Sequence, residues 1–193
     1  EILSKALGFL SQGKTLIEQA WPDEEKKAIV SYQLLTAKPR LYLLNGSEND
    51  VSPELKETFY KSNCVFLIMD ILMELEAADL TAEEKASLGL AEESKINELI
   101  KESYRLLGLI TFLTTGPDET RAWTLKKNKT APQAGGVIHS DFESRFIKAE
   151  VINWQTLLTS GGFSQAKEKG LLRTEGKEYI VQDGDVIEIK SGQ

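Results

Sequence analysis

The sequence is poor in the residues that form cross-links and metal sites. Its 193 residues include one cysteine, Cys64, and one histidine, His139. A single cysteine cannot form an internal disulfide, which favours a reducing, cytoplasmic setting. One histidine also excludes a histidine-rich metal site.

Long apolar runs and an initiator methionine are absent as well. The longest uninterrupted apolar run is Val65 to Met69, whereas a membrane helix needs about 20 apolar residues, so we expect no membrane-spanning segment. The chain begins at Glu1 without a signal-peptide pattern, and we expect it to be a fragment or a processed chain. Its length suits one good core or two small ones.

Negative charge dominates, but it is distributed unevenly. The whole chain has 23 basic and 30 acidic side chains, a net charge of −7. Residues 1–110 hold 12 basic and 19 acidic side chains, while residues 111–193 hold 11 of each, so all of the excess lies in the first part. This asymmetry indicates two units with different partners. Within the second part, four cations fall in nine residues without an acid: Arg121, Lys126, Lys127 and Lys129.

The apolar spacing changes from helical to strand-like near residue 108, where we place the domain boundary, giving domains 1–109 and 110–193. In the first domain, helices are predicted near residues 2–10, 22–37, 53–61 and 92–107, with a capping box at 81–84 and strands at 40–44 and 65–69. The helix from Pro22 is expected to turn Ala28, Ile29, Tyr32 and Leu35 inward. In the second domain, strands are predicted at 109–114, 121–126, 146–152, 177–181 and 186–189, short helices at 134–140, 154–158 and 165–169, and turns at 116–118 and 183–184.

A literal nucleotide-binding motif occurs near the start of the chain. Residues 8–15 match the P-loop pattern G-x-x-x-x-G-K-[ST], and Val65 to Asp70 is similar to a Walker B strand. Together they would describe a small kinase with Lys14 on phosphate and Thr15 on magnesium. A P-loop must follow a buried strand, however, and residues 1–7 have helical spacing. We therefore favour a turn between two helices, centred on Gly13.

Motifs spread over some eighty residues carry a family resemblance. They are Gly116 to Thr124, Lys129 to Ala134, Gly136 to Glu143, Phe146 to Ile152, Glu175 to Tyr179 and Val181 to Asp185. This series resembles the C-terminal TGS domain of the YchF (Obg-like) ATPase family, which has a ubiquitin-like β-grasp fold. The resemblance implies an α+β protein: a helix-rich, partial α/β part, namely an incomplete P-loop NTPase domain, followed by a TGS domain.

The resemblance extends upstream to Asn45-Gly46-Ser47-Glu48. This segment falls where the family carries Asn-x-x-Glu, a motif that reads the nucleotide base, so the resemblance implies base contacts from Asn45 and Glu48. By the same register, Asp70 replaces the lysine of the supporting Ser-Ala-Lys segment. The family's P-loop and magnesium site lie N-terminal to this chain. We therefore expect no hydrolysis and no cofactor for this chain, with ATP or GTP and magnesium bound only by a complete family member.

The predicted function is that of a non-catalytic module that binds ribosomes or structured RNA. Cations on neighbouring strands are expected to contact phosphates without reading bases, although an ordinary solvated face is the alternative. The candidate contact residues are Arg121, Lys126, Lys127, Lys129, Arg145 and Lys148. The acidic first half is a possible site for a protein partner. Two alternatives stay open: a fragment of a complete ATP- or GTP-hydrolysing enzyme, and the small P-loop kinase.

Four further residues have plainer interpretations. We expect His139 to make a hydrogen bond at a helix end, because no nucleophile or second base accompanies it. The pair Asp183 and Asp185 around a glycine is expected to form a β-turn and not a metal loop. Trp123 is expected to be a core residue, because it shares a strand face with Leu125.

Overall fold

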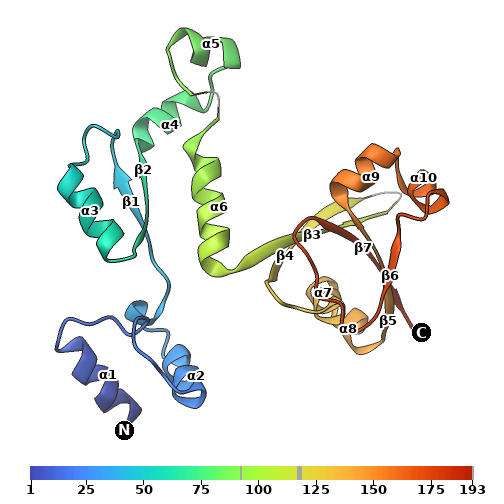
Figure 1. The fold of residues 1–193 in the computed structure, drawn as a ribbon, viewed down its shortest axis with the longest axis horizontal. Helices are drawn as coiled ribbons and strands as arrows, with labels where there is room; N and C mark the ends of the chain where they lie inside the picture. The colour runs from blue at the N-terminus through green and yellow to red at the C-terminus, as the bar shows by residue number, and fades with distance from the viewer. Residues whose placement is uncertain (92, 117–118, 193) are drawn as a thin grey trace. The chain divides into compact units, whose positions relative to one another are not determined.

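The computed structural model describes residues 1–91, 93–116 and 119–192 and divides into two compact units, Glu1–Leu106 and Leu107–Gln193 (Figure 1). Parts of two predicted features, the helix start at Glu92 and the turn at Pro117 and Asp118, lie outside the described residues. Over the described ranges, no helix has the length and apolar character needed to cross a membrane. The fold is α+β, as the sequence predicts.

The first unit is mostly helical. Its elements, in chain order, are α1 (Ile2–Leu10), α2 (Asp23–Ser31), the 3-10 helix η1 (Leu35–Ala37), β1 (Leu41–Asn45), α3 (Pro53–Lys61), β2 (Val65–Met69), α4 (Ile71–Ala77), α5 (Ala82–Ser87) and α6 (Lys95–Leu107). Each predicted helix and strand has a counterpart, although the helix predicted at 22–37 ends at Ser31, and α4 is an additional helix that was not predicted.

Side-chain caps determine where several of these helices begin. The Ser52 hydroxyl accepts a hydrogen bond from the Leu55 amide at 3.2 Å at the start of α3. Thr81 and Glu84 form the predicted capping box of α5. Asp70 starts α4, because its Oδ1 accepts from the Met73 amide at 3.0 Å. Each cap satisfies an amide that the first turn of a helix leaves unpaired.

The first unit has a small sheet and a small core. Strands β1 and β2 pair in parallel, with Leu41 opposite Val65 and Asn45 opposite Met69. A separate cluster of three buried side chains joins α1 and α2: Ala6, Leu16 and Ile29. Two inward predictions for the second helix are wrong. The helix ends at Ser31, so Tyr32 and Leu35 lie beyond it, and they are 53% and 79% exposed.

The second unit is built on one mixed sheet. Its elements are β3 (Leu109–Thr115), β4 (Thr120–Lys126), α7 (Ala131–Ile138), α8 (Ser140–Ser144), β5 (Phe146–Asn153), α9 (Trp154–Ser160), α10 (Phe163–Glu168), β6 (Arg173–Glu175) and β7 (Asp185–Ser191). The strand order is β4-β3-β7-β5-β6, with β3 and β7 parallel and the other neighbours antiparallel. A helix packed on such a sheet gives the β-grasp arrangement predicted for this part of the chain.

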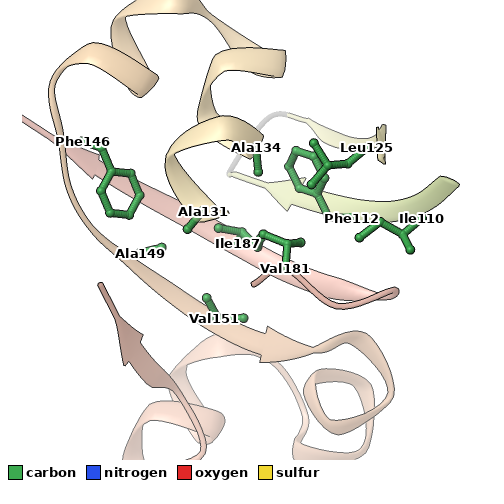
Figure 2. Packing of buried hydrophobic residues seen from close by; sticks show 10 residues of the cluster. All are labelled: Ile110, Phe112, Leu125, Ala131, Ala134, Phe146, Ala149, Val151, Val181 and Ile187. Carbon is green, nitrogen blue, oxygen red and sulfur yellow. The ribbon is translucent and has the colours of Figure 1, made fainter. Parts of the chain in front are cut away.

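The main core lies between this sheet and α7. Figure 2 shows Ala131 and Ala134 of the helix facing the apolar side chains of the strands, including Phe112 and Ile187. Phe112 is 0% exposed. Helix and sheet pack closely at Gly135, where an added Cβ would lie 3.1 Å from the Ile189 Cδ1 atom. Trp123 and Leu125 both face this core, as predicted.

The opposite face of the sheet carries a second, smaller cluster. Ile152 and Val186 of the strands pack there with Ala166 of α10, and the half-buried Leu157 of α9 joins them. Because both faces of the sheet are partly covered by helices, the strands of this unit bury side chains on both sides.

Two predictions for the second unit are wrong. The strand predicted at 177–181 is a turn with one isolated bridge, between Thr130 and Ile180, and the short strand lies at Arg173–Glu175 instead. The helix predicted at 134–140 begins earlier, because Thr130 and Gln133 form a capping box, and it stops at Ile138. His139 then caps α8: its Nδ1 accepts from the Asp141 amide at 3.2 Å, which confirms the predicted helix-end role.

Candidate functional site

The edge strand β4 presents an arginine stacked on a tryptophan. The Cζ atom of Arg121 lies over the Trp123 ring, 4.2 Å from its centroid. The indole Nε1 donates a hydrogen bond to Thr114 Oγ1 at 2.8 Å. Arg121 is exposed and Trp123 is half-buried. The core position predicted for Trp123 is present, but the sequence analysis missed that the outer face of its ring supports a cation.

The three candidate lysines lie at the other end of β4 and in the loop that follows it. Lys126 donates a hydrogen bond to the Leu107 carbonyl at 2.6 Å. Side chains alternate along a strand, so Arg121 and Lys126 lie on opposite faces of the sheet. Lys127 and Lys129 are exposed, and neither forms an ion pair with a carboxylate in the described ranges of the chain. Their ammonium groups are therefore available to an external anion.

Arg145 and Lys148 belong to a different part of the surface. Arg145 caps the end of α8, and Lys148 lies near the start of β5 opposite Lys190. Strands β3 and β7 separate β5 from β4, so the expectation that neighbouring strands carry all six cations does not hold. Lys190 pairs with Glu188, and this hydrogen bond raises the pKa of the Lys190 ammonium.

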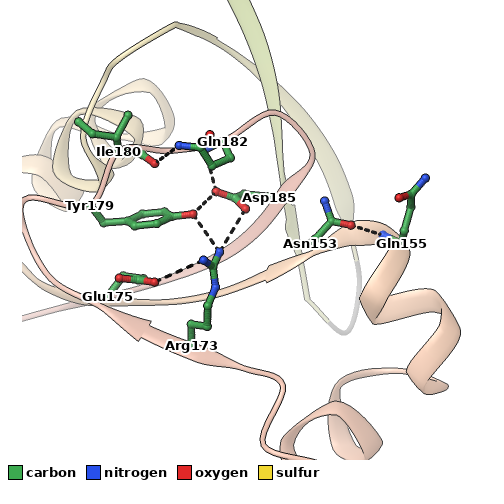
Figure 3. A network of polar contacts seen from close by, with 8 residues as sticks. All are labelled: Asn153, Gln155, Arg173, Glu175, Tyr179, Ile180, Gln182 and Asp185. Atoms are coloured by element: carbon green, nitrogen blue, oxygen red, sulfur yellow. Dashed lines mark hydrogen bonds and ion pairs between the residues drawn. The ribbon is translucent and has the colours of Figure 1, made fainter.

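A buried polar network holds the loop that supports Lys129 (Figure 3). Asp185, 2% exposed, accepts hydrogen bonds from the Tyr179 hydroxyl at 2.7 Å and from the Gln182 amide at 2.8 Å. Burial and the neighbouring Asp185 carboxylate raise the pKa of Tyr179 to about 12. The same loop also holds the backbone at Lys129, because the Val181 amide donates a hydrogen bond to the Lys129 carbonyl at 3.0 Å.

The predicted turn at 183–184 is present and ties the loop to the sheet. Gly184 has a φ of +80°, which glycine adopts without strain. Asp183 Oδ1 accepts a hydrogen bond from the Thr111 amide at 2.7 Å. Asp183 therefore holds a backbone donor of the protein, and Asp185 holds both a backbone and a side-chain donor.

The candidate base-reading residues lie at the carboxyl end of the parallel strand pair. Asn45 Oδ1 accepts a hydrogen bond from the Ile71 amide at 3.1 Å, which ties it to the start of α4. Glu48 pairs with Lys56 at 2.7 Å, and this hydrogen bond lowers the pKa of the Glu48 carboxyl. Next to them lies a cavity of about 420 Å³ with a largely apolar lining that includes Met73, Ala77 and Leu90. Glu48 and Asp70 also line it.

The literal P-loop motif does not form a phosphate cradle. Gly8 to Leu10 are the last residues of α1, and no strand precedes them in the described part of the chain. Gly13, with a φ of +73°, lies in the predicted turn between helices. The Thr15 hydroxyl is buried within the protein, while Lys14 is exposed. The residues present therefore do not fit the phosphates and magnesium of a nucleotide.

The two units together define a class of protein. It has a helix-rich unit with a small parallel sheet, followed in the chain by a β-grasp unit with a basic edge strand. The family described as YchF-GTPase_C, a protein of unknown function (DUF933), matches residues 109–191. These residues include every strand of the β-grasp sheet.

Known proteins resemble the whole chain. The "Ribosome-binding ATPase YchF" of Bacillus subtilis is 42% identical over 98% of this chain and 55% of the relative, and "Obg-like ATPase 1" of Rattus norvegicus is 39% identical over 88% and 46%. The Schizosaccharomyces pombe YchF GTPase structure has a TM-score of 0.82 at 32% identity, covering 98% of this chain and 53% of that one. Residues 109–191 thus match this family, and the chain as a whole is similar to the C-terminal part of YchF and Obg-like ATPases. It spans about half the length of the curated relatives it matches.

Proposed function

We propose that this chain is a non-catalytic module that docks on ribosomes or structured RNA through the basic end of strand β4. Lys127 and Lys129 are the central contacts, with Arg121 and Lys126 beside them along the strand. Arg145 and Lys148 form a second, separate contact. Docking of this kind places the protein in the cytoplasm, and the acidic first unit is then free to meet a protein partner.

The single observation that carries this proposal is the pair of exposed lysines without acidic partners in the described chain. Among the described residues of the second unit, two other cations are neutralised internally: Arg173 pairs with Asp185 and Glu175, and Lys190 pairs with Glu188. An ammonium that is not neutralised by its own protein can release counterions from a nucleic-acid backbone when it binds phosphate. Relatives named ribosome-binding ATPases support the same partner.

Charge reversal of both lysines tests the proposal. We expect Lys127→Glu with Lys129→Glu to weaken co-sedimentation with ribosomes at least about tenfold. The slope of log affinity against log salt concentration should fall by the amount that corresponds to about two phosphate contacts. The matched control reverses two exposed lysines elsewhere in the same unit, Lys167 and Lys177, with the same change in net charge. The control should bind as the unmodified chain does. Equal binding by both double variants would remove the proposal.

A second function is favoured by the length comparison and by the cavity beside Glu48. The relatives are about twice as long as the matched region, so this chain is, in the alternative, the base-reading and TGS portion of a complete ATP- or GTP-hydrolysing enzyme. In that protein, Asn45 and Glu48 contact the base, and the phosphates and magnesium lie on residues outside this chain. Titration of labelled ATP into residues 1–193 separates the two functions, since saturable, magnesium-independent binding that is lost in Glu48→Ala would contradict a purely docking role.

A further inference from the structure

We propose that the Arg121–Trp123 stack is a binding site for an unpaired nucleobase, so that the RNA contacted by β4 is single-stranded at this point. The inference rests on the proposed docking function and adds the class of nucleotide that is recognised. Phosphate contacts alone would accept duplex and single strand alike, whereas a stacking platform requires a base whose face is exposed.

The stack is rigid on one side and open on the other. The indole is fixed from within by packing on the core and by its hydrogen bond to Thr114 Oγ1. The guanidinium covers the outer face of the indole, and Arg121 itself is exposed to solvent. Among the described residues, no carboxylate forms an ion pair with Arg121. One face of the guanidinium is therefore supported by the indole, and the described residues place no ion-pair partner on the other face.

The same unit contains a second arginine–aromatic pair that serves as an internal comparison. Arg173 lies over the Tyr179 ring at 5.4 Å, but it also pairs with Glu175 and Asp185, and it donates to the Tyr179 hydroxyl. That guanidinium is committed to the protein's own network (Figure 3). Within the described residues, the Arg121 guanidinium forms no ion pair, and it lies closer to its ring, at 4.2 Å. Guanidinium planes stack on nucleobases in the way that aromatic side chains do.

The position of the stack on β4 provides a path for an extended strand. β4 is an outer strand of the sheet, with β3 on one side only. Lys126 lies five positions after Arg121, which corresponds to about 17 Å along a strand. A base on Arg121 and phosphates on Lys127 and Lys129 would therefore belong to the same short single-stranded segment. A stacking platform beside cations that follow the backbone is the general design of single-strand binding sites.

The test compares two RNA probes that differ only in their bases. Fluorescence anisotropy of the complete 193-residue chain is measured with a short oligoadenylate and with an abasic ribose-phosphate strand of equal length. We expect the unmodified chain to bind oligoadenylate about tenfold more tightly than the abasic strand. Arg121→Lys keeps the charge and removes the plane, so it should reduce this preference to about twofold or less. Arg40→Lys, the same change at an arginine that lies over the Tyr42 ring in the first unit, should leave the preference intact.

Two further variants make every outcome decisive. Trp123→Leu keeps an apolar side chain on the core and removes the support of the guanidinium, and it should reduce the base preference as Arg121→Lys does. Lys127→Glu with Lys129→Glu should weaken both probes equally and leave the preference unchanged. If this double variant binds both probes normally, the docking function fails. If it weakens both probes while Arg121→Lys keeps the preference, or if the unmodified chain shows no preference, the stacking site alone is refuted. Thermal unfolding of each variant controls for a change in fold.

Discussion

The two units of this protein contrast in how they bury apolar side chains. The second unit surrounds a five-stranded sheet with helices on both faces, and its main core includes Phe112, Val151 and Ile187 at 0–2% exposure. The first unit pairs only two parallel strands, and its compact cluster consists of three side chains. Parallel sheets are ordinarily covered by other elements on both faces. The sheet of the first unit is too small to form such a core, so the stability of this unit depends on helix caps and small side-chain clusters. We therefore expect the β-grasp unit to unfold more cooperatively than the first unit.

The largest expected difference between the two units is in the unfolding free energy that each loses when an aromatic ring is deleted. Phe112→Ala should destabilise the second unit by about 3 to 5 kcal/mol, because the ring is fully buried and leaves a cavity. Phe66→Ala in β2 removes a half-buried ring that packs on Phe59 at 5.1 Å, and it should cost less. Hydrogen exchange of the strand amides during urea unfolding measures both losses. Equal losses would abolish the contrast between the two units.

The polar network of the second unit predicts an intermediate effect that depends on pH. Tyr179→Phe removes the hydroxyl that donates to the buried Asp185 and should cost about 2 kcal/mol at neutral pH. The folded state raises the pKa of Tyr179 from 10.0 to about 12, so the unfolded chain loses its proton first. The contribution of this tyrosine is therefore complete below pH 10 and is lost as the pH rises towards 12.

The measurement for this network is the difference in unfolding free energy between the unmodified chain and Tyr179→Phe, taken across that pH range. The difference should shrink as the pH rises, since only the unmodified chain titrates at this position. The Phe variant itself serves as the control for every other group that titrates. A difference that stays constant with pH would show that the Tyr179 hydroxyl is not held in a stabilising contact.

The smallest expected effect concerns the helix caps. Ser52→Ala should destabilise α3 by about 1 kcal/mol, because the Leu55 amide loses its acceptor. Asn153→Ala is the matched change in the second unit, since its side chain accepts from the Gln155 amide at the start of α9. Amide exchange of α3 and of α9 reports each helix directly. We expect the first change to loosen its helix more, because α9 is also packed on the sheet through Leu157.

Local chemistry made much of the fold predictable. The caps at Ser52 and Thr81, the helical spacing of Ile2 to Leu10, and the alternation of Trp123 and Leu125 each act within a few residues. The start of α7 at Ala131 was also available from the sequence, because Thr130 and Gln133 follow the capping-box pattern. The motifs from Gly116 to Asp185 identified the family.

Long-range contacts account for what the sequence analysis missed. The segment Lys177–Val181 has the residue pattern of a strand but forms a turn. The Tyr179 hydroxyl donates a hydrogen bond to Asp185, and the Tyr179 carbonyl accepts one from the Ala131 amide. The separation of Lys148 from Lys129 follows from the strand order, in which β3 and β7 intervene. The functional assignments of Asn45, Glu48 and the six cations stay predictions.

Spacing, caps and motifs are properties of neighbouring residues, so the elements, the family resemblance and the uneven distribution of charge can be read directly from the chain. The tertiary structure alone decided which cations lie together and which aromatic ring supports one of them. The stack itself lies within the β3–β4 hairpin, where Thr114 of β3 accepts from Trp123 and Trp123 supports Arg121 two residues away on β4. The strand pattern places Arg121 and Trp123 on one face, but only the pairing of β4 with β3 fixes the ring beneath the guanidinium.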